Sequence, residues 1–248
     1  MLSQLPKSLS EPPESTAQAS GFCRVAGVDE AGRGPWAGPV VAAAVILEPS
    51  CVAHEGRRPW PSLGVKIDDS KRLTPAQRER AYPVILERAV VGVGIASSDT
   101  IDAVNIFQAT LRAMATAIDD LDAQPDLVLV DGLHAPSVRI PCWTIVDGDR
   151  LSYSVACASI IAKVLRDSLM VFYHRLFPDY DFDRHKGYGT ERHLDRLQAL
   201  GPSVLHRMSF RPVWASVSTQ RVEAGDEEAT TGSDASAVPM VVATSVAA

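Results

Sequence analysis

Four acidic side chains follow short apolar runs of this sequence and are candidates for binding metal ions. Asp29 and Glu30 end the run that begins at Val25, while Asp131 and Asp149 follow two later apolar runs. In an open α/β sheet the ligand crevice lies outside the strand ends, so acids distant in sequence can converge there. A single aspartate at such a position is as well explained by a turn, because Asp-Gly is common in turns. The recurrence of acids at strand ends predicts convergence.

Gathered carboxylates require compensating positive charge. Two unit charges 4 Å apart repel by ~4 kcal/mol at an effective dielectric of 20. Two divalent cations would balance four carboxylates, and oxygen ligands without cysteine or histidine select Mg²⁺ or Mn²⁺. Such a pair of ions activates a water on one side of a phosphodiester and stabilises the leaving oxyanion on the other. The four acids therefore predict phosphodiester hydrolysis.

A glycine-rich turn follows the first two acids directly. It contains Gly32, Arg33 and Gly34 and is followed by Pro35. Glycine allows a positive φ and a close approach of the backbone, so that N–H groups can point at a ligand oxygen. We expect a cation site beside a sugar–phosphate site. The alternative is an ordinary strand-to-turn junction with solvated acids.

The elements that must position these residues alternate between strands and helices. Apolar runs bounded by turn residues predict strands, and helical periodicity with capping residues predicts helices. The expected strands are 24–30, 40–47, 90–96, 126–130 and 143–146; the expected helices are 75–87, 99–121, 152–176 and 191–200. This order indicates an α/β fold, a central mixed sheet flanked by helices, with a C-terminal helical segment.

The two ends of the chain differ from its centre in composition. Residues 1–21 are rich in Ser, Pro, Glu and Ala without periodicity, and residues 217–248 are rich in Ala, Ser, Thr and acids. We expect a disordered arm at 1–21, one domain at 22–216 and a disordered acidic tail at 217–248. The net charge is −6. Most of it falls in the tail, so a basic groove in the domain is compatible with the total.

Composition limits the class of protein. Hydrophobic residues make up 46% and charged residues 22% of the 248 residues, as is typical of globular proteins. No signal peptide or membrane-spanning run is recognisable, so a cytoplasmic protein with no membrane partner is expected. The four cysteines show no zinc-binding spacing and are expected to be reduced.

Seven blocks of the sequence resemble type 2 ribonuclease H, and most closely bacterial ribonuclease HII. The blocks occur in order between Val25 and Val213. They are GVDEAGRGPWAGPVV at 27–41, DDSKRL at 68–73, LVDG at 129–132, GD at 148–149, ASIIAKVLRD at 158–167, HKGYGT at 185–190 and HRMSFRPV at 206–213.

This resemblance implies a ribonuclease H-like fold and metal-dependent cleavage of RNA in RNA–DNA hybrids. The implied substrates include single ribonucleotides embedded in duplex DNA, cut on the 5′ side to leave 3′-OH and 5′-phosphate ends. Asp29, Glu30, Asp131 and Asp149 match the family's metal-binding acids, with Asp167 a rival for the fourth place. We favour Asp149, because Asp167 lies within a helix four residues after Lys163 and suits a supporting ion pair.

The resemblance also implies which residues contact the substrate. Gly32, Arg33 and Gly34 match the loop that reads the 2′-OH, and Tyr188 matches the tyrosine that packs on the adjacent deoxyribose. Tyr188 would otherwise be a core aromatic residue. Ser70, Lys71 and Arg72 suit phosphate contacts, although a solvated position in the loop before the helix explains Arg72 equally well. A monomer is expected.

Three departures from the family pattern are visible. They are Asp147 where lysine is usual, Trp36 where leucine is common, and a long excursion at 48–64. None removes a proposed ligand. The remaining alternatives are a nuclease of the same fold that acts on DNA and a non-catalytic hybrid-binding module.

Overall fold

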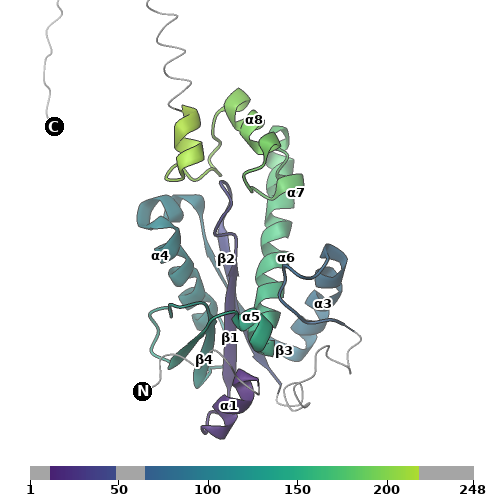
Figure 1. Ribbon diagram of the computed structural model, residues 1–248, viewed down its shortest axis with the longest axis vertical. Helices are drawn as coiled ribbons and strands as arrows, with labels where there is room; N and C mark the ends of the chain where they lie inside the picture. Colours follow the sequence, from purple (N-terminus) through teal and green to yellow (C-terminus); the bar gives the residue numbers. More distant parts are fainter. Residues whose placement is uncertain (1–11, 49–64, 218–248) are drawn as a thin grey trace, which may run out of the picture.

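The protein is an α/β structure built around a mixed five-stranded sheet (Figure 1). A computed structural model describes residues 12–48 and 65–217. The strands are β1 (Val25–Ala31), β2 (Val40–Leu47), β3 (Ala89–Ala96), β4 (Leu127–Asp131) and β5 (Cys142–Ile145), in the order β3-β2-β1-β4-β5. The principal helices are α3 (Pro75–Arg88), α4 (Ser98–Asp119), α6 (Tyr153–Leu176) and α8 (Glu191–Leu200). The predicted fold class, strands and helices are confirmed, with ends shifted by one or two residues, except that the helix predicted at 99–121 is interrupted.

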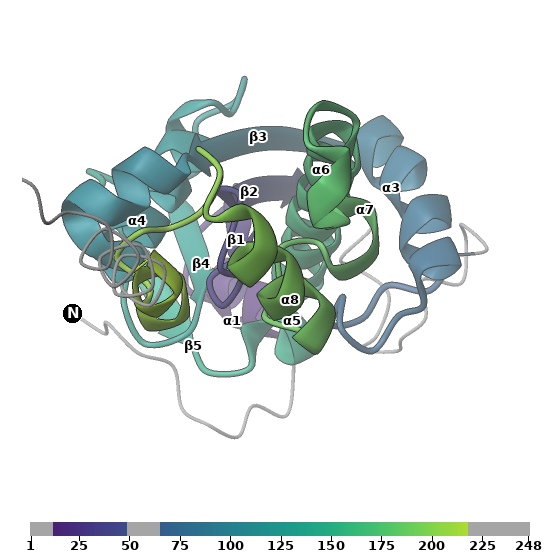
Figure 2. The ribbon, with the colours of Figure 1, turned by 90° about the horizontal axis from the view of Figure 1, so that it is seen from above.

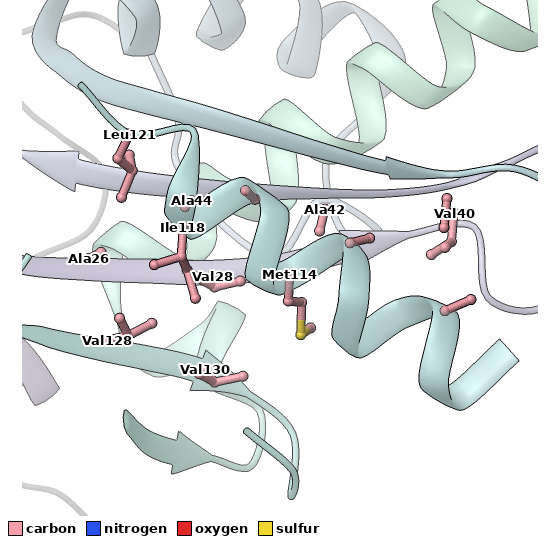
Figure 3. Close-up of a cluster of buried hydrophobic side chains, with 14 of the residues drawn as sticks. Ala26, Val28, Val40, Ala42, Ala44, Met114, Ile118, Leu121, Val128 and Val130 are labelled. Carbon is pink, nitrogen blue, oxygen red and sulfur yellow. The ribbon is translucent and has the colours of Figure 1, made fainter. Parts of the chain in front are cut away.

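Strand β2 shows why helices cover both faces of the sheet. All eight of its residues are buried, so it has no solvent face. Because side chains alternate along a strand, Val40, Ala42 and Ala44 enter one core cluster and Ala43 and Val45 enter another. The first cluster contains Met114 and Ile118 of α4 (Figure 3). The second contains residues of α6 and α3, which lie on the other side of the sheet (Figure 2).

The direction of the strands brings the acidic residues to one edge. β1 runs parallel to β4, and β4 runs parallel to β5, whereas β2 is antiparallel to β1. The carboxyl ends of β1, β4 and β5 therefore lie at the same edge of the sheet, the edge at which these strands end. Asp29, Asp131 and the turn after β5 are located at this edge.

The starts of the helices follow their capping residues, but α4 is not continuous. Thr74 and Gln77 form a capping box at the start of α3. Asn105 interrupts α4 with a φ of 69°, and its side chain accepts a hydrogen bond from the N–H of Gln108. The single helix predicted at 99–121 is thus two helical pieces joined at a kink, because the asparagine side chain caps the second piece.

The N-terminal segment contains an ordered helix that we did not predict. Helix α1 spans Pro13–Ala19, with Glu14 and Ala17 buried. Ala17 packs in a cluster with Leu127, Leu129 and Trp143. The expectation of a disordered arm at 1–21 therefore fails for residues 13–19, because a short Ser/Pro-rich segment can fold when it has a core to pack against. Residues 1–11, the tail at 218–248 and the excursion at 49–64 lie outside the described residues.

The C-terminal part adds short helices at the end of the molecule opposite α1 (Figure 1). They are a 3-10 helix at Pro178–Tyr180, α7 (Phe182–His185), α8 and a helical turn at 211–217. Phe182 and Met170 pack with Ala37, which joins this part to the loop after β1. No helix in the described residues is long and apolar enough to cross a membrane.

Candidate active site

Asp29 and Asp131 lie on neighbouring parallel strands and face the same side of the sheet. Val28 pairs with Val130, so the next residue of each strand is an aspartate. Asp29 is only 4% exposed. Burial, and then the charges of Glu30 and Asp131, hold its pKa well above the usual value. The fold has therefore brought the acids of two distant segments together.

Asp149 is held beside Asp131 by a short helix. After β5 the chain turns at Asp147, which has a φ of 56°, and enters α5 (Gly148–Leu151). The N–H of Gly148 donates to Oδ1 of Asp131 at 2.7 Å. Burial, followed by the charges of Asp131 and Asp69, raises the pKa of Asp149 to about 6.

Glu30 completes the set at the end of β1. It follows Asp29, so its side chain leaves the strand on the opposite face, at the point where β4 has ended. Burial raises its pKa, and the charge of Asp131 adds to this, although Arg33 opposes both. Nη1 of Arg33 lies 3.4 Å from Oε1 of Glu30. The charge of Asp131 thus acts on each of the other three predicted acids.

Lys71 places a positive charge among these acids. Burial alone would lower its pKa, but the surrounding Asp29, Asp149, Asp69 and Asp131 raise it. The same ammonium lowers the pKa of Asp131, against the larger effect of burial. Lys71 therefore balances part of the negative charge of the site.

The loop that carries Lys71 is anchored to helix α6 by buried contacts. The hydroxyls of Ser70 and Ser159 are 2.8 Å apart, and Ser159 also hydrogen bonds to Asp29. Arg78 donates to the carbonyls of Ser70 and Leu73 at 2.8 and 2.6 Å. Because the Ser70 side chain is only 4% exposed, its hydroxyl is directed at the protein interior in this structure.

The donor set fits a hard divalent cation. The four groups are carboxylates whose pKa values are raised by burial and by the charges of nearby acids, an arrangement that a cation relieves. Within residues 12–48 and 65–217, no three acidic, histidine or cysteine side chains already surround one ion position.

The glycine-rich loop follows Asp29 and Glu30 in the chain, and Tyr188 lies beside helix α6. Arg33 and Gly34 are exposed, whereas Gly32 is buried with a φ of 99°. Tyr188 is 43% exposed, so it is not a core aromatic residue. Its ring centroid lies 5.6 Å from Nζ of Lys163 and 5.8 Å from Cζ of Arg166. A partly exposed aromatic ring therefore stands beside two cationic side chains.

Comparison with known proteins decides the family. The family model for ribonuclease HII matches residues 26–213. Ribonuclease HII of Syntrophus aciditrophicus is 52% identical over 199 residues, which cover 80% of this chain and 89% of that protein. The chain belongs to the ribonuclease HII family. The resemblance inferred from the sequence motifs is confirmed.

Solved structures of related enzymes share the fold of this ribonuclease HII. Ribonuclease H2 of Pyrococcus horikoshii superposes with a TM-score of 0.65 at 22% identity and covers 80% of this chain and 99% of its own. Bst ribonuclease HIII, solved in complex with Mn²⁺, has a TM-score of 0.62 at 19% identity. The match covers 88% of this chain and 75% of the ribonuclease HIII chain. At these identities the likeness extends to the fold alone.

As a ribonuclease HII, the protein is a metal-dependent endonuclease that hydrolyses the RNA strand of RNA–DNA hybrids. Asp167, the rival for a metal-binding place, accepts a 2.8 Å hydrogen bond from Lys163 and lies 3.9 Å from Arg78. Asp167 and Lys163 lie on α6, and Arg78, which holds the Lys71 loop, lies on α3. Asp167 therefore links the two helices, which is the supporting role we expected.

Sequence reasoning about this ribonuclease HII missed several residues of the site. Ser159, Asp69, Lys163 and Arg166 were quoted within motifs but given no substrate or metal role. For two of them, Ser159 and Arg166, the signal was a polar residue on a buried part of helix α6, where they are 3% and 0% exposed. Their partners lie far away in the sequence, so the pattern alone could not reveal them.

Proposed function

We propose that Asp29, Glu30, Asp131 and Asp149 hold two divalent ions, Mg²⁺ or Mn²⁺, with which the enzyme cuts on the 5′ side of a ribonucleotide. When bound, such ions supply an activated water and stabilise the leaving oxyanion, giving 3′-OH and 5′-phosphate ends. The observation that supports this most strongly is the gathering of four partly or fully buried acids from three separate segments. A bound cation would offset the repulsion between their charges.

We further propose that the surrounding residues select a ribonucleotide within duplex DNA. Gly32, Arg33 and Gly34 read the 2′-OH, and Tyr188 packs on the neighbouring deoxyribose. Lys71 contacts the adjacent phosphate. The exposure of Arg33, Gly34 and Tyr188, and the contact between Arg33 and Glu30, support these roles. A phosphate contact by Ser70 stays a prediction, and its buried hydroxyl favours a part in holding the loop.

The metal assignment is tested by Asp131→Asn, which keeps the side-chain oxygen that accepts the Gly148 N–H. We expect cleavage of a duplex with one ribonucleotide in Mg²⁺ to fall at least ~100-fold, because metal-supported charge stabilisation is lost. The metal-free variant should melt no lower than the wild type, since it lacks one of the repelling charges. Full Mg²⁺-dependent cleavage by the variant would refute the assignment.

A substrate panel tests the proposed selectivity. Matched duplexes with no ribonucleotide, one ribonucleotide or a continuous RNA strand should show cleavage of the last two only, in Mg²⁺ and in Mn²⁺. Cutting of the all-DNA duplex at a comparable rate would instead favour a DNA nuclease. The monomeric state and the cytoplasmic location stay predictions from the sequence.

A further inference from the structure

Two fully buried arginines lie behind the proposed ribonucleotide-reading surface. Arg166 and Arg207 are each 0% exposed. In the described part of the chain, the hydrogen bonds from both guanidinium groups go to backbone carbonyls. A buried charge is costly unless its donors are satisfied, so a residue that supplies five donors in a fixed fork suits this position. The positions of the accepting carbonyls show which backbone segments the two arginines hold in place.

Arg207 organises the glycine loop, defined here as residues 32–38. Its guanidinium donates to carbonyls at four positions along the loop. These are Gly32 at 2.6 Å, Arg33 at 2.9 Å, Pro35 at 2.7 Å, and Gly38 at 3.0 and 2.8 Å. One side chain thus sets the direction of most peptide groups in the loop. Because these carbonyls point inward, the loop is fixed in one conformation from behind.

Arg166 connects the glycine loop to the Tyr188 turn, defined here as residues 186–189. Its guanidinium donates to the carbonyl of Ala37 at 3.1 Å and to that of Lys186 at 3.0 Å, while Nε donates to Pro39 at 2.9 Å. The N–H of Trp36 donates to the carbonyl of Gly187 at 2.8 Å. The two segments are therefore bonded to each other and to a common cation.

Glycine is required where the loop and the turn meet these groups. A Cβ on Gly32 would lie 2.0 Å from Nε of Arg166, and a Cβ on Gly187 would lie 2.4 Å from the carbonyl oxygen of Ala37. Both glycines have a positive φ, 99° and 82°. The loop, the arginine and the turn are packed too closely for any of them to move alone.

We propose that Arg166 and Arg207 are positioning residues that fix the glycine loop and the Tyr188 turn as one preset ribonucleotide-reading surface without touching the substrate. This inference rests on the proposed roles of the loop and of Tyr188. Arg207 sets the loop, and Arg166 sets the distance between the loop and the tyrosine. Their buried charges also add positive potential beneath a surface that must receive a phosphodiester.

The test compares Arg166→Lys with the wild type on two substrates. Lysine keeps the charge but cannot serve carbonyls in both segments. We expect kcat/KM for the single-ribonucleotide duplex to fall about tenfold more than kcat/KM for a continuous RNA–DNA hybrid, since misplacement of a positioning contact is costly. Only the first substrate offers Tyr188 a deoxyribose next to the ribonucleotide. Mn²⁺ affinity, measured by calorimetry, should stay within about twofold of the wild-type value, because the acids are not altered.

Two further variants keep the test decisive. Gly187→Ala leaves both arginines in place but forces the turn away from Ala37, so it should reproduce the change in substrate ratio even if Arg166→Lys does not fold. Ile118→Ala creates a cavity on the α4 face of the sheet, and it should lower the melting temperature while keeping the wild-type ratio.

The outcomes separate this inference from the proposed function. An unchanged substrate ratio in Arg166→Lys or Gly187→Ala, with a loss of stability like that of Ile118→Ala, would make the arginines structural residues only. Loss of Mn²⁺ affinity in parallel with cleavage would also overturn the inference. A wild-type enzyme that fails to cut the single-ribonucleotide duplex would refute the proposed function and this inference with it.

Discussion

Gly34 differs from the other glycines of its loop because nothing inside the protein requires it. Gly32 has a positive φ and lies against Arg166, and Gly38 has a positive φ and lies against Met170. Gly34 has no positive φ, and a Cβ there would meet no atom within 4 Å. Its missing side chain therefore leaves the outer surface clear, which is useful where a nucleic acid backbone must approach closely.

Gly34→Ala should therefore separate activity from stability. We expect the free energy of unfolding, measured with urea, to change by less than ~0.5 kcal/mol. Cleavage of the single-ribonucleotide duplex should fall at least ~10-fold, because the new methyl group occupies the space of the approaching backbone. Gly32→Ala is the contrasting variant and should lose stability. Wild-type kcat/KM in Gly34→Ala would remove this glycine from the substrate-facing surface.

At the scale of elements, the helices act chiefly by holding loops that carry the site. Helix α6 is the clearest case: Ser159 contacts the Lys71 loop, Lys163 contacts the Tyr188 turn, and Arg166 contacts both that turn and the glycine loop. Its N-terminus is held in turn by helix α1. Oε1 of Glu14 accepts hydrogen bonds from Oγ of Ser152 at 2.5 Å, and from N and Oγ of Ser154 at 2.9 and 2.8 Å.

Glu14→Ala should destabilise the protein, although Glu14 lies in a segment that looks dispensable in the sequence. The substitution leaves the Ser154 N–H and two hydroxyls without their buried acceptor, and it removes a negative charge that favours a helix N-terminus. We expect a loss of ~1–3 kcal/mol in the free energy of unfolding by urea denaturation. Gln18→Ala, exposed on the same helix, is the control. An unchanged denaturation midpoint in Glu14→Ala would show that α1 contributes nothing to stability.

At the scale of the whole molecule, a cluster of three histidines joins the C-terminal helices to the site. The N–H of Ser203 donates to Nδ1 of His206, so neutral His206 donates from Nε2 to Nε2 of His193, 3.0 Å away. His193 then donates from Nδ1 to the carbonyl of Tyr188 at 2.9 Å. Rings of His185 and His193 stack with centroids 4.2 Å apart. Because Nδ1 of His206 and Nε2 of His193 act as acceptors, both rings are neutral, and His185 is neutral likewise because its Nδ1 accepts from the N–H of Gly187.

The histidine cluster predicts a loss of stability in acid. Burial lowers the pKa of His193 to about 4 and that of His206 to about 3, and it lowers the pKa of His185. In the unfolded chain these histidines take up protons below their ordinary pKa of 6.5, whereas in the folded protein they stay neutral. The free energy of unfolding is therefore highest above pH 6.5 and declines as the pH falls towards 4. Each histidine contributes a slope of up to ~1.4 kcal/mol per pH unit.

Urea denaturation between pH 7 and pH 5 measures this slope. His206→Asn should show a shallower pH dependence than the wild type, because one proton-linked group is removed. His134→Gln, at an exposed position, should keep the wild-type dependence. The acids at the site act in the opposite direction, because their raised pKa values favour protonation in the folded protein. Equal slopes in wild type and His206→Asn would contradict the neutral cluster.

A large part of the fold and of the candidate site could be predicted from local sequence patterns. The apolar run of β2, the capping box of α3 and the motif order predicted the elements, the fold class and the four acids, because periodicity, caps and strand-end residues act over a few neighbouring positions. Only the tertiary structure decided the rest. Helix α1, the inward Ser70 hydroxyl and the contacts of Arg166 and Arg207 with the glycine loop depend on partners more than eighty residues away in sequence, as with Glu14 and Ser152. A buried polar group is explained by the partner that satisfies it, and the chain must fold before that partner is beside it.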